Sequence, residues 1–472
     1  MNTLLQKNWP WLVTAGLIVL WLLSTVVKYD PPIGDPRPIG GEADILALAE
    51  QEDLNILFVL IDTLRADRLG AYGYERDTSP AIDAFASKGV RFSRHLSQSS
   101  WTKCSMASMW TGLYPSRTGV TRFDHVVPEA AEMPAERLRD AGFRTIGLWR
   151  NGWVAPNFGF EQGFDVYTRP PRRTMNPTVL AQNPTIKNTG TDEDTVAAAI
   201  EFLRVSGHDG RWFLYLHLMD LHEFLYDAES AIFGGKHSDM YDNSILWTDG
   251  TLDALFTYLA EFGLAENTLV VITSDHGEAF RERGIEGHAR AVYRETTEVP
   301  LLMSFPFQLG PDLVIPTRSQ NIDVWPTIFE LIGLDPSEDA DGTSRVPEIL
   351  AAVAGESLSD SETMGISFLD ETWGQQQSTE PKYRIGVTHG PYRYLRSPPR
   401  GGETEPFEEL FDAEQDPDEL DNLVSNHAEL VEELREVAEA QLDISPPWGE
   451  TPKRELGELE LNQLRALGYA IP

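Results

Sequence analysis

The feature that most constrains the fold of this chain is a series of short, continuous apolar runs. The runs cover residues 54–62, 143–149, 212–220, 267–275 and 299–305. An apolar run of this length, without alternation of polar residues, is typical of a β-strand that is buried on both faces. Stretches with helical spacing of apolar residues, such as 78–89 and 248–263, lie between the runs. Strands that alternate with helices predict an α/β fold with a large, mostly parallel sheet.

The chain divides into regions of different composition. The alternating runs occupy residues 51–344, which we expect to form the main domain. Residues 345–442 contain short strand-like runs and a long acidic helical stretch, which predict a smaller C-terminal α+β subdomain. Residues 443–472 form a polar tail whose amphipathic end we expect to pack on the main domain.

The amino terminus carries an uncharged apolar run at residues 9–27, which is long enough to span a bilayer as a helix. A cleaved signal peptide is the alternative, but its apolar region is shorter and no small-x-small cleavage site follows this run. Lys7 precedes the run, and Asp30 and Asp35 follow it. By the positive-inside rule, residues 1–8 form a cytoplasmic stub and the main domain is periplasmic or extracellular. Residues 28–50 begin with many prolines and glycines and predict a linker.

Composition excludes several classes of protein. The chain has 38 Lys and Arg against 74 Asp and Glu, a formal net charge of 38 − 74 = −36. Nucleic-acid binding depends on clustered Lys and Arg, so we expect no nucleic-acid partner. The single cysteine excludes a disulfide within the chain and a zinc site built from several cysteines. The oligomeric state is left open.

Polar side chains follow two of the apolar runs. Asp62 ends the first run, and Asp275 with His276 ends the run 267–275. Because the carboxyl ends of parallel strands face one crevice, these side chains are candidates for a common site. Carboxylate and imidazole groups are ligands for divalent metals. The sequence therefore predicts a metal site at this edge of the sheet.

Several longer motifs carry a resemblance to a known family. They cover residues 57–74, 99–120, 269–280, 286–302, 321–334 and 409–423. Together they resemble the sulfatase branch of the alkaline phosphatase superfamily. The resemblance implies an alkaline-phosphatase-like sandwich and a hydrolase of sulfuric or phosphoric esters. It also implies one divalent ion, which is Ca, Mg, Mn or Zn, held by Asp62, Asp275, His276 and the nucleophile.

The resemblance places the nucleophile at Thr102. In the family the nucleophile precedes a Thr-Gly pair by nine residues, and here that pair is Thr111-Gly112. Cys104 is followed by neither the proline nor the arginine of the family's maturation signal, so formylglycine is not expected. A threonine in this position resembles the phosphodiesterases, phosphonate hydrolases and phosphotransferases of the superfamily.

The resemblance also assigns the other site residues. His222 matches a histidine placed over the ester, and His288 falls where many sulfatases have a lysine, so both are candidate catalytic residues. Asn151 aligns with a substrate-binding stretch. Many members have a second aspartate after the first strand, where this chain has Thr63.

We therefore predict a membrane-anchored, metal-dependent, sulfatase-like hydrolase that acts through Thr102 on an anionic ester of a glycan, lipid or small molecule. Three alternatives stay open. A phosphotransferase that modifies a lipid or glycan acceptor would use the same residues. A true sulfatase would carry formylglycine at Cys104, and an inactive binding protein would keep the fold alone.

Overall fold

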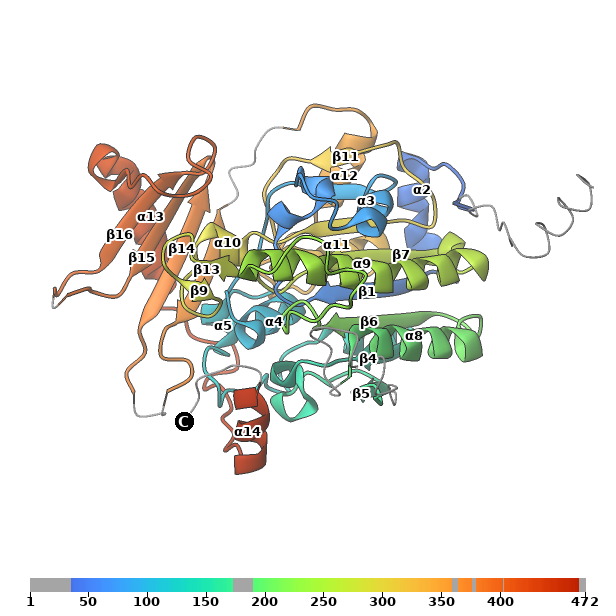
Figure 1. Ribbon diagram of the computed structural model, residues 1–472, viewed down its shortest axis with the longest axis horizontal. Helices are drawn as coiled ribbons and strands as arrows, with labels where there is room; N and C mark the ends of the chain where they lie inside the picture. Colours follow the sequence, from blue (N-terminus) through green and yellow to red (C-terminus); the bar gives the residue numbers. More distant parts are fainter. Residues whose placement is uncertain (1–34, 173–189, 359–363, 376–378, 402, 467–472) are drawn as a thin grey trace, which may run out of the picture. The chain divides into compact units, whose positions relative to one another are not determined.

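The computed structural model describes residues 35–172, 190–358, 364–375, 379–401 and 403–466 of the chain. An eight-stranded mixed sheet carries its larger part, with β1 near the centre (Figure 1). β1 is parallel to β6 and β7, β6 to β4, β4 to β5, and β11 to β2, whereas β10 is antiparallel to both β7 and β2. The predicted α/β class and large sheet are confirmed, and β10 makes the sheet mixed. The strands, in sheet order, are β11 (Leu313–Ile315), β2 (Val90–Phe92), β10 (Leu301–Ser304), β7 (Thr268–Thr273), β1 (Asn55–Ile61), β6 (Trp212–Leu218), β4 (Arg144–Leu148) and β5 (Val166–Thr168).

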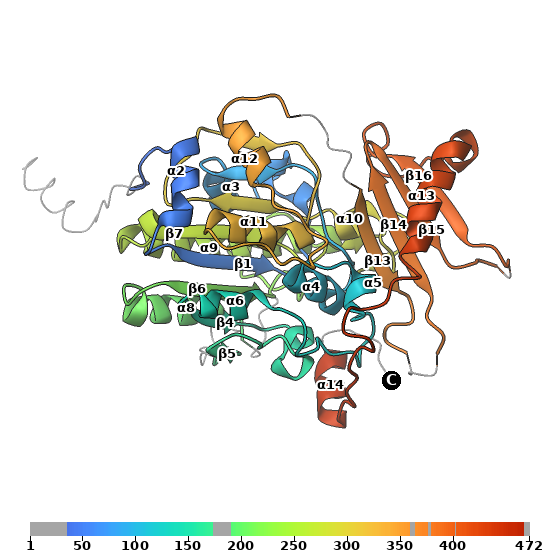
Figure 2. The same ribbon diagram turned by 180° about the vertical axis from the view of Figure 1, so that it is seen from behind.

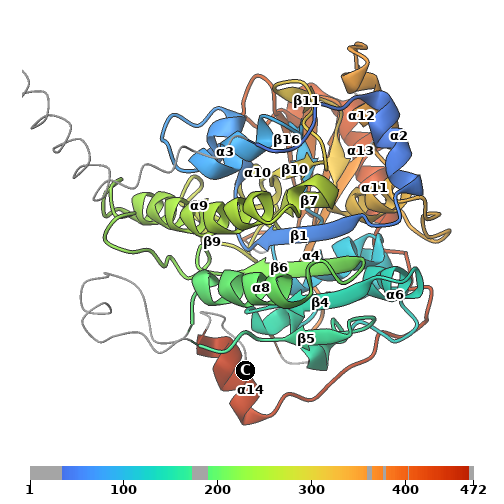
Figure 3. The same ribbon diagram turned by 90° about the vertical axis from the view of Figure 1, so that its right-hand side faces the viewer.

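Helices cover both faces of this sheet (Figure 3). Ile56, Phe58 and Leu60 of β1 belong to one apolar core, and Leu57, Val59 and Ile61 belong to a second. Both faces of the strand are therefore buried, as its continuous apolar run predicts. The first core includes residues of α2 (Glu42–Ala47), α4 (Thr102–Thr111), α6 (Pro134–Asp140), α11 (Val324–Leu331) and α12 (Val346–Val353). The second includes residues of α3 (Pro80–Ala86), α8 (Asp192–Ser206) and α9 (His237–Glu261).

A smaller four-stranded antiparallel sheet follows, with α13 packed on its middle strands (Figure 2). The predicted α+β character of this part is confirmed. Its elements are β13 (Gly365–Asp370), β14 (Tyr383–His389), β15 (Tyr392–Ser397), β16 (Phe407–Asp412) and α13 (Ala428–Ala440). Helix α12 packs against β11 and α2 of the larger part, so the predicted boundary between residues 344 and 345 precedes a helix that belongs with the first sheet. The remaining short elements are β3 (His95–Leu96), β8 (Ala279–Phe280), β9 (Glu286–Gly287), β12 (Ser319–Gln320), α5 (Pro115–Thr118), α10 (Arg294–Thr297) and α14 (Glu458–Ala466).

Among the hydrogen bonds that join the smaller sheet to the larger part, three lie close in sequence to predicted site residues. The Phe368 amide donates to Gln98 O, and Ser367 Oγ donates to Ser97 O, both at 2.8 Å. Trp373, which follows β13, donates from Nε1 to Ala289 O at 3.1 Å. Strand β13 is thereby tied to two separate loops of the larger part.

The two ends of the chain differ from the sequence prediction in different ways. Residues 42–50 of the predicted linker are helical, as α2 and a 3₁₀ turn, because Ile45 and Leu48 are buried in the first core. Helix α14 packs near residues 152–154, and Leu464 is buried, so the tail lies on the main domain as expected. The predicted stub and membrane segment, residues 1–8 and 9–27, lie outside the described residues. Within the described part, no helix is long and apolar enough to cross a bilayer.

A buried histidine makes the stability of this fold depend on pH. The two ring nitrogens of His95 hydrogen-bond with Ser319 Oγ and Asn321 Oδ1, each at 2.8 Å. Burial lowers the pKa of His95 to about 3. Between this value and the unfolded value near 6.5, the unfolded state binds the extra proton, so stability falls as the pH drops below about 6.5. We expect this group to lower the free energy of unfolding by about 2 kcal/mol between pH 7 and pH 5.

Urea unfolding of variants at the two pH values measures this contribution. His95→Gln removes the titrating group, so its unfolding free energy should change less between pH 7 and pH 5 than that of the wild type. His208→Gln, at an exposed position, should keep the wild-type difference. An unchanged pH dependence in His95→Gln would show that other groups govern acid stability.

Candidate active site

The two predicted aspartates meet at the carboxyl ends of the central strands. Asp62 directly follows β1, and Asp275 lies two residues beyond β7, its parallel neighbour. One ligand atom each from Asp62, Asp275 and His276 lies within 4.8 Å of the others, and all three residues are fully buried. The structure therefore brings together the three side chains that the sequence predicts as metal ligands.

The hydrogen bonds of this cluster leave room for a cation. Within the described part of the chain, Asp62 Oδ1 and Asp275 Oδ2 are buried without a hydrogen-bond partner. His276 Nδ1 lies 3.0 Å from Gly277 O, to which it donates, so Nε2 keeps its lone pair. Two buried carboxylate oxygens and an imidazole lone pair suit a divalent ion.

The charges of the cluster also favour a bound cation. Burial by itself raises the pKa of Asp62, but nearby His222, His217 and His276 outweigh it and hold the pKa below its usual range. Burial, and then the neighbouring charge of Asp62, raise the pKa of Asp275. Two carboxylates this close repel each other, and a bound cation relieves the repulsion.

Thr102 begins helix α4 and faces the cluster. Its Oγ1 lies 3.1 Å from His276 Nε2 and 3.3 Å from Asn151 Nδ2. The helix N-terminus directs backbone N–H groups toward this point, which favours an anionic group there. Thr102 is therefore placed as the sequence predicts for the nucleophile.

Asn151 bridges Thr102, the predicted nucleophile, and Asp62. Its Nδ2 donates to Asp62 Oδ2 at 2.6 Å, and its Oδ1 accepts from the Trp153 amide at 2.8 Å, which fixes the orientation of the amide. Asn151 Nδ2 therefore fixes the position of Thr102 Oγ1 relative to the Asp62 carboxylate. A direct contact of Asn151 with substrate stays a prediction.

Thr63, which replaces the second family aspartate, adds no carboxylate to the site. Its backbone is left-handed, with φ of 65°, and its amide lies 3.3 Å from Asp275 Oδ1. The hydroxyl donates to Asp62 O at 2.6 Å. A branched residue with positive φ is strained, and these contacts hold it in place.

His217 is the site residue that sequence reasoning missed. It lies on β6, fully buried, with Nε2 at 3.0 Å from Asp62 Oδ2 and Nδ1 at 2.6 Å from Tyr215 OH. In the sheet it pairs with Leu60, and since strand side chains alternate, it shares a face with Asp62. A lone histidine inside an apolar strand, in register with a site residue, is the signal that could have found it.

The two predicted catalytic histidines also lie at the cluster. The ring centroid of His288 is 4.6 Å from that of His276 and 4.9 Å from that of His222. Burial is the main cause that lowers the pKa of His222 to about 4. Burial by itself lowers the pKa of His288, but the Glu278 carboxylate, 2.8 Å from Nδ1, more than offsets it and the pKa is raised.

Three other residues near the site make their contacts outside the cluster of Asp62, Asp275 and His276. Cys104 is buried in the first core, and burial raises the pKa of its thiol to about 12, so it is not a thiolate nucleophile. Lys103 donates from Nζ to Phe123 O at 2.6 Å. Asp220 pairs with Arg150.

Comparison with known proteins identifies the family. Residues 54–334 match the model of the Sulfatase family, and residues 287–443 match the model described as N-sulphoglucosamine sulphohydrolase, C-terminal. The chain belongs to the sulfatase family. The predicted class, a hydrolase of sulfuric or phosphoric esters, is confirmed for this sulfatase-family chain.

The relatives of this sulfatase-family protein, and the solved structures that it resembles, are named for different substrates. It is 24% identical to an N-acetylgalactosamine-6-O-sulfatase of Bacteroides thetaiotaomicron, over 82% of this chain and 92% of the relative. It is 27% identical to arylsulfatase A of Bos taurus, over 85% of this chain and 90% of the relative. The phosphonate monoester hydrolase of Agrobacterium radiobacter shares its fold, with a TM-score of 0.64 and 19% identity over 82% of this chain and 95% of that one.

Proposed function

We propose that this sulfatase-family protein is a metal-dependent hydrolase that cleaves monoanionic esters through a covalent intermediate on Thr102. The observation that carries the proposal is the position of Thr102 Oγ1, 3.1 Å from His276 Nε2 at the cluster of Asp62 and Asp275. Cys104, two residues along the same helix, is buried in the apolar core instead.

Asp62, Asp275, His276 and Thr102 would hold one divalent ion, which is Ca, Mg, Mn or Zn. The unpartnered buried oxygens of the two aspartates are the support for this assignment. When bound, the ion lowers the pKa of the Thr102 hydroxyl and stabilises negative charge on the transferred group.

The described side chains account for both half-reactions. Thr102 Oγ1 forms a bond to the phosphorus or sulfur atom as the bond to the leaving oxygen breaks; the Thr102 proton goes to solvent, and His288 gives a proton to the leaving oxygen. Water then attacks the Thr102 ester, passes one proton to His288 and releases the acid, and the Thr102 oxygen takes back a proton from solvent. His222 faces the same reacting group and, being neutral near pH 7, can hydrogen-bond its oxygen atoms.

The charge around the cluster favours a substrate with one negative charge. Of the described cations adjoining the site residues in sequence, Lys103 is bound to Phe123 O, and Arg150 is paired with Asp192 at 2.7 Å and with Asp220. Neither of these two cations is therefore available to pair with a second negative charge on the substrate, which would lie near the Asp62 and Asp275 carboxylates. Phosphonate monoesters, phosphodiesters and sulfate monoesters carry one charge, whereas a phosphate monoester carries two near pH 8.

Three 4-nitrophenyl esters separate these classes: the phenylphosphonate, the sulfate and the phosphate. We expect the phenylphosphonate to be cleaved fastest, because a threonine nucleophile resembles the phosphonate hydrolases, and the kcat/KM for the phosphate to be at least about tenfold lower. A preference for the phosphate would contradict the charge argument. No turnover of any ester by metal-loaded protein would favour the inactive binding protein.

We also propose that residues 9–27 anchor the protein in a membrane, with the catalytic domain outside the cytoplasm. The support is the uncharged apolar run and the charges that flank it. Extraction of membranes at alkaline pH would leave an anchored chain in the pellet, and its recovery in the supernatant would contradict the anchor.

A further inference from the structure

A two-stranded hairpin sets Glu278 opposite the candidate catalytic His288. In the antiparallel ladder of β8 and β9, Ala279 pairs with Gly287, and Phe280 pairs with Glu286. Continuing the register by one position places Glu278 across from His288. There the Glu278 carboxylate, which is 4% exposed, accepts a hydrogen bond from His288 Nδ1 at 2.8 Å.

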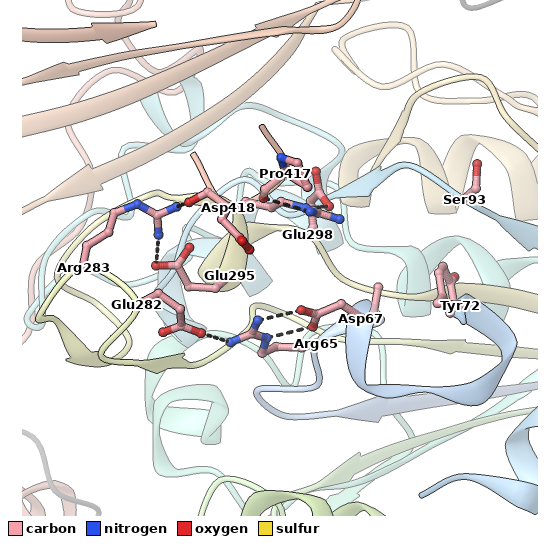
Figure 4. A pocket seen from close by; sticks show the side chains of 12 residues that line it. Arg65, Asp67, Tyr72, Ser93, Glu282, Arg283, Glu295, Glu298, Pro417 and Asp418 are labelled. Carbon is pink, nitrogen blue, oxygen red and sulfur yellow. Dashed lines mark hydrogen bonds and ion pairs between the residues drawn. The ribbon is translucent and has the colours of Figure 1, made fainter. Parts of the chain in front are cut away.

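Two arginines, Arg65 and Arg283, hold the hairpin in place. Arg65 donates to Glu278 O at 2.9 Å and to Glu282 Oε1 at 2.6 Å. Arg283 pairs with Glu295 at 2.5 Å. These arginines line a cavity of about 130 Å³, and Figure 4 shows both of them directed at carboxylates rather than into open space. Both arginines are therefore engaged by groups of the protein, and we assign no ligand to the cavity.

The hydrogen bond to Glu278 decides which nitrogen of His288 can act. An ionised carboxylate only accepts, so Nδ1 carries a hydrogen and the ring can meet an ester only through Nε2. The same bond fixes the rotation of the ring, which lies 4.6 Å from the His276 ring between centroids. Without the carboxylate, the ring is free to change tautomer and orientation.

We propose that Glu278 is a positioning residue that holds His288 Nε2 toward the leaving oxygen of the substrate. This inference rests on the proposed function, because it gives Glu278 a part in the proton transfer that accompanies leaving-group departure. As the bond from phosphorus or sulfur to that oxygen breaks, the Nε2 proton moves to the oxygen. The electron pair of the broken bond stays on the oxygen.

A pair of substrates that differ only in the leaving group distinguishes positioning from a merely structural role. 4-Nitrophenyl phenylphosphonate releases a stable phenolate without help, whereas methyl phenylphosphonate releases methoxide and needs the proton. Glu278→Gln keeps the size of the side chain but not its charge. We expect it to lower kcat on the methyl ester by about 100-fold and kcat on the nitrophenyl ester by only a few-fold.

Three further variants sharpen this test. His288→Ala should show the same selectivity, and the double variant should be no slower than His288→Ala alone, because both residues act through one proton. Glu286→Gln makes the same chemical change at a more exposed position of the same hairpin, where the side chain pairs with Arg281. It should leave both rates near those of the wild type.

Equal losses on both esters in Glu278→Gln would overturn the inference, as would additive losses in the double variant. Either result could occur while Thr102→Ala still abolishes turnover, so the proposed function would stand. If the wild type cleaves neither phosphonate but cleaves sulfates, 4-nitrophenyl sulfate and methyl sulfate form the matching pair. If the metal-loaded wild type cleaves no ester at all, the proposed function itself fails. The melting temperature of each variant shows that it is folded.

Discussion

Thr102→Ala is expected to lower kcat by about 10⁴-fold or more, because the covalent route is lost with the hydroxyl. The rate is measured on the best of the three nitrophenyl esters at saturating metal, since Thr102 is also a proposed ligand. Thr102→Ser should retain a reduced but measurable rate, because it keeps the hydroxyl and loses only the methyl group that restricts its rotation. Mass spectrometry of rapidly quenched wild type should find the transferred group on the peptide that carries Thr102.

Cys104→Ser is the matched control on the same helix. The side chain is buried and its pKa is about 12, so the change should preserve most of the activity and cost about 1–3 kcal/mol of stability through the buried hydroxyl. A true sulfatase would give the opposite pattern. Its Cys104 peptide would contain an aldehyde, Cys104→Ala would abolish turnover, and Thr102→Ala would spare it.

Asp275→Asn should stabilise the metal-free protein and lose most of the stability that metal adds to the wild type. In metal-free wild type the buried Asp62 and Asp275 carboxylates repel each other, so a neutral amide of the same shape should raise the melting temperature. Its Oδ1 can still accept from the Thr63 amide and the His276 amide, as that of Asp275 does. A divalent ion at 100 times its Kd should stabilise the wild type by about 2.7 kcal/mol and the variant far less.

Differential scanning calorimetry with Ca, Mg, Mn or Zn, each added separately to chelator-treated protein, measures this gain. Asp249→Asn is the control, because Asp249 is also buried but accepts from the Ala81 and Ile82 amides away from the cluster. Its metal-dependent gain should equal that of the wild type. A wild type whose melting temperature responds to none of the four ions would contradict the metal site.

The sequence was informative where one physical rule decides the outcome. Buried parallel strands must be apolar throughout, so β1, β6 and β7 were visible, and their carboxyl ends located Asp62 and Asp275. The nine-residue spacing to the Thr-Gly pair of the family located Thr102 in the sequence. The helix α2 was missed because its six residues follow a proline-rich stretch, and only contacts with distant segments bury Ile45.

Residues whose roles depend on pairing between segments were not visible. His217 reads as one polar residue in an apolar strand until the register of β6 against β1 is known. Glu278 gains a partner only through the hairpin register that brings residue 288 opposite to it. Both depend on strand pairing, which short-range patterns leave undetermined.

The attachment of strand β13 has a consequence for how the active site can move. Its bonds to Ser97 and Gln98 lie a few residues before Thr102, and the Trp373 bond to Ala289 lies beside His288. Strand β13 and the residues that follow it thus brace the two loops that carry Thr102 and His288, the proposed nucleophile and leaving-group acid. Hinge opening between the two sheets would have to break these bonds and pull on both loops at once. The proposed catalytic groups are therefore preassembled, and the energy of substrate binding need not be spent on bringing them together.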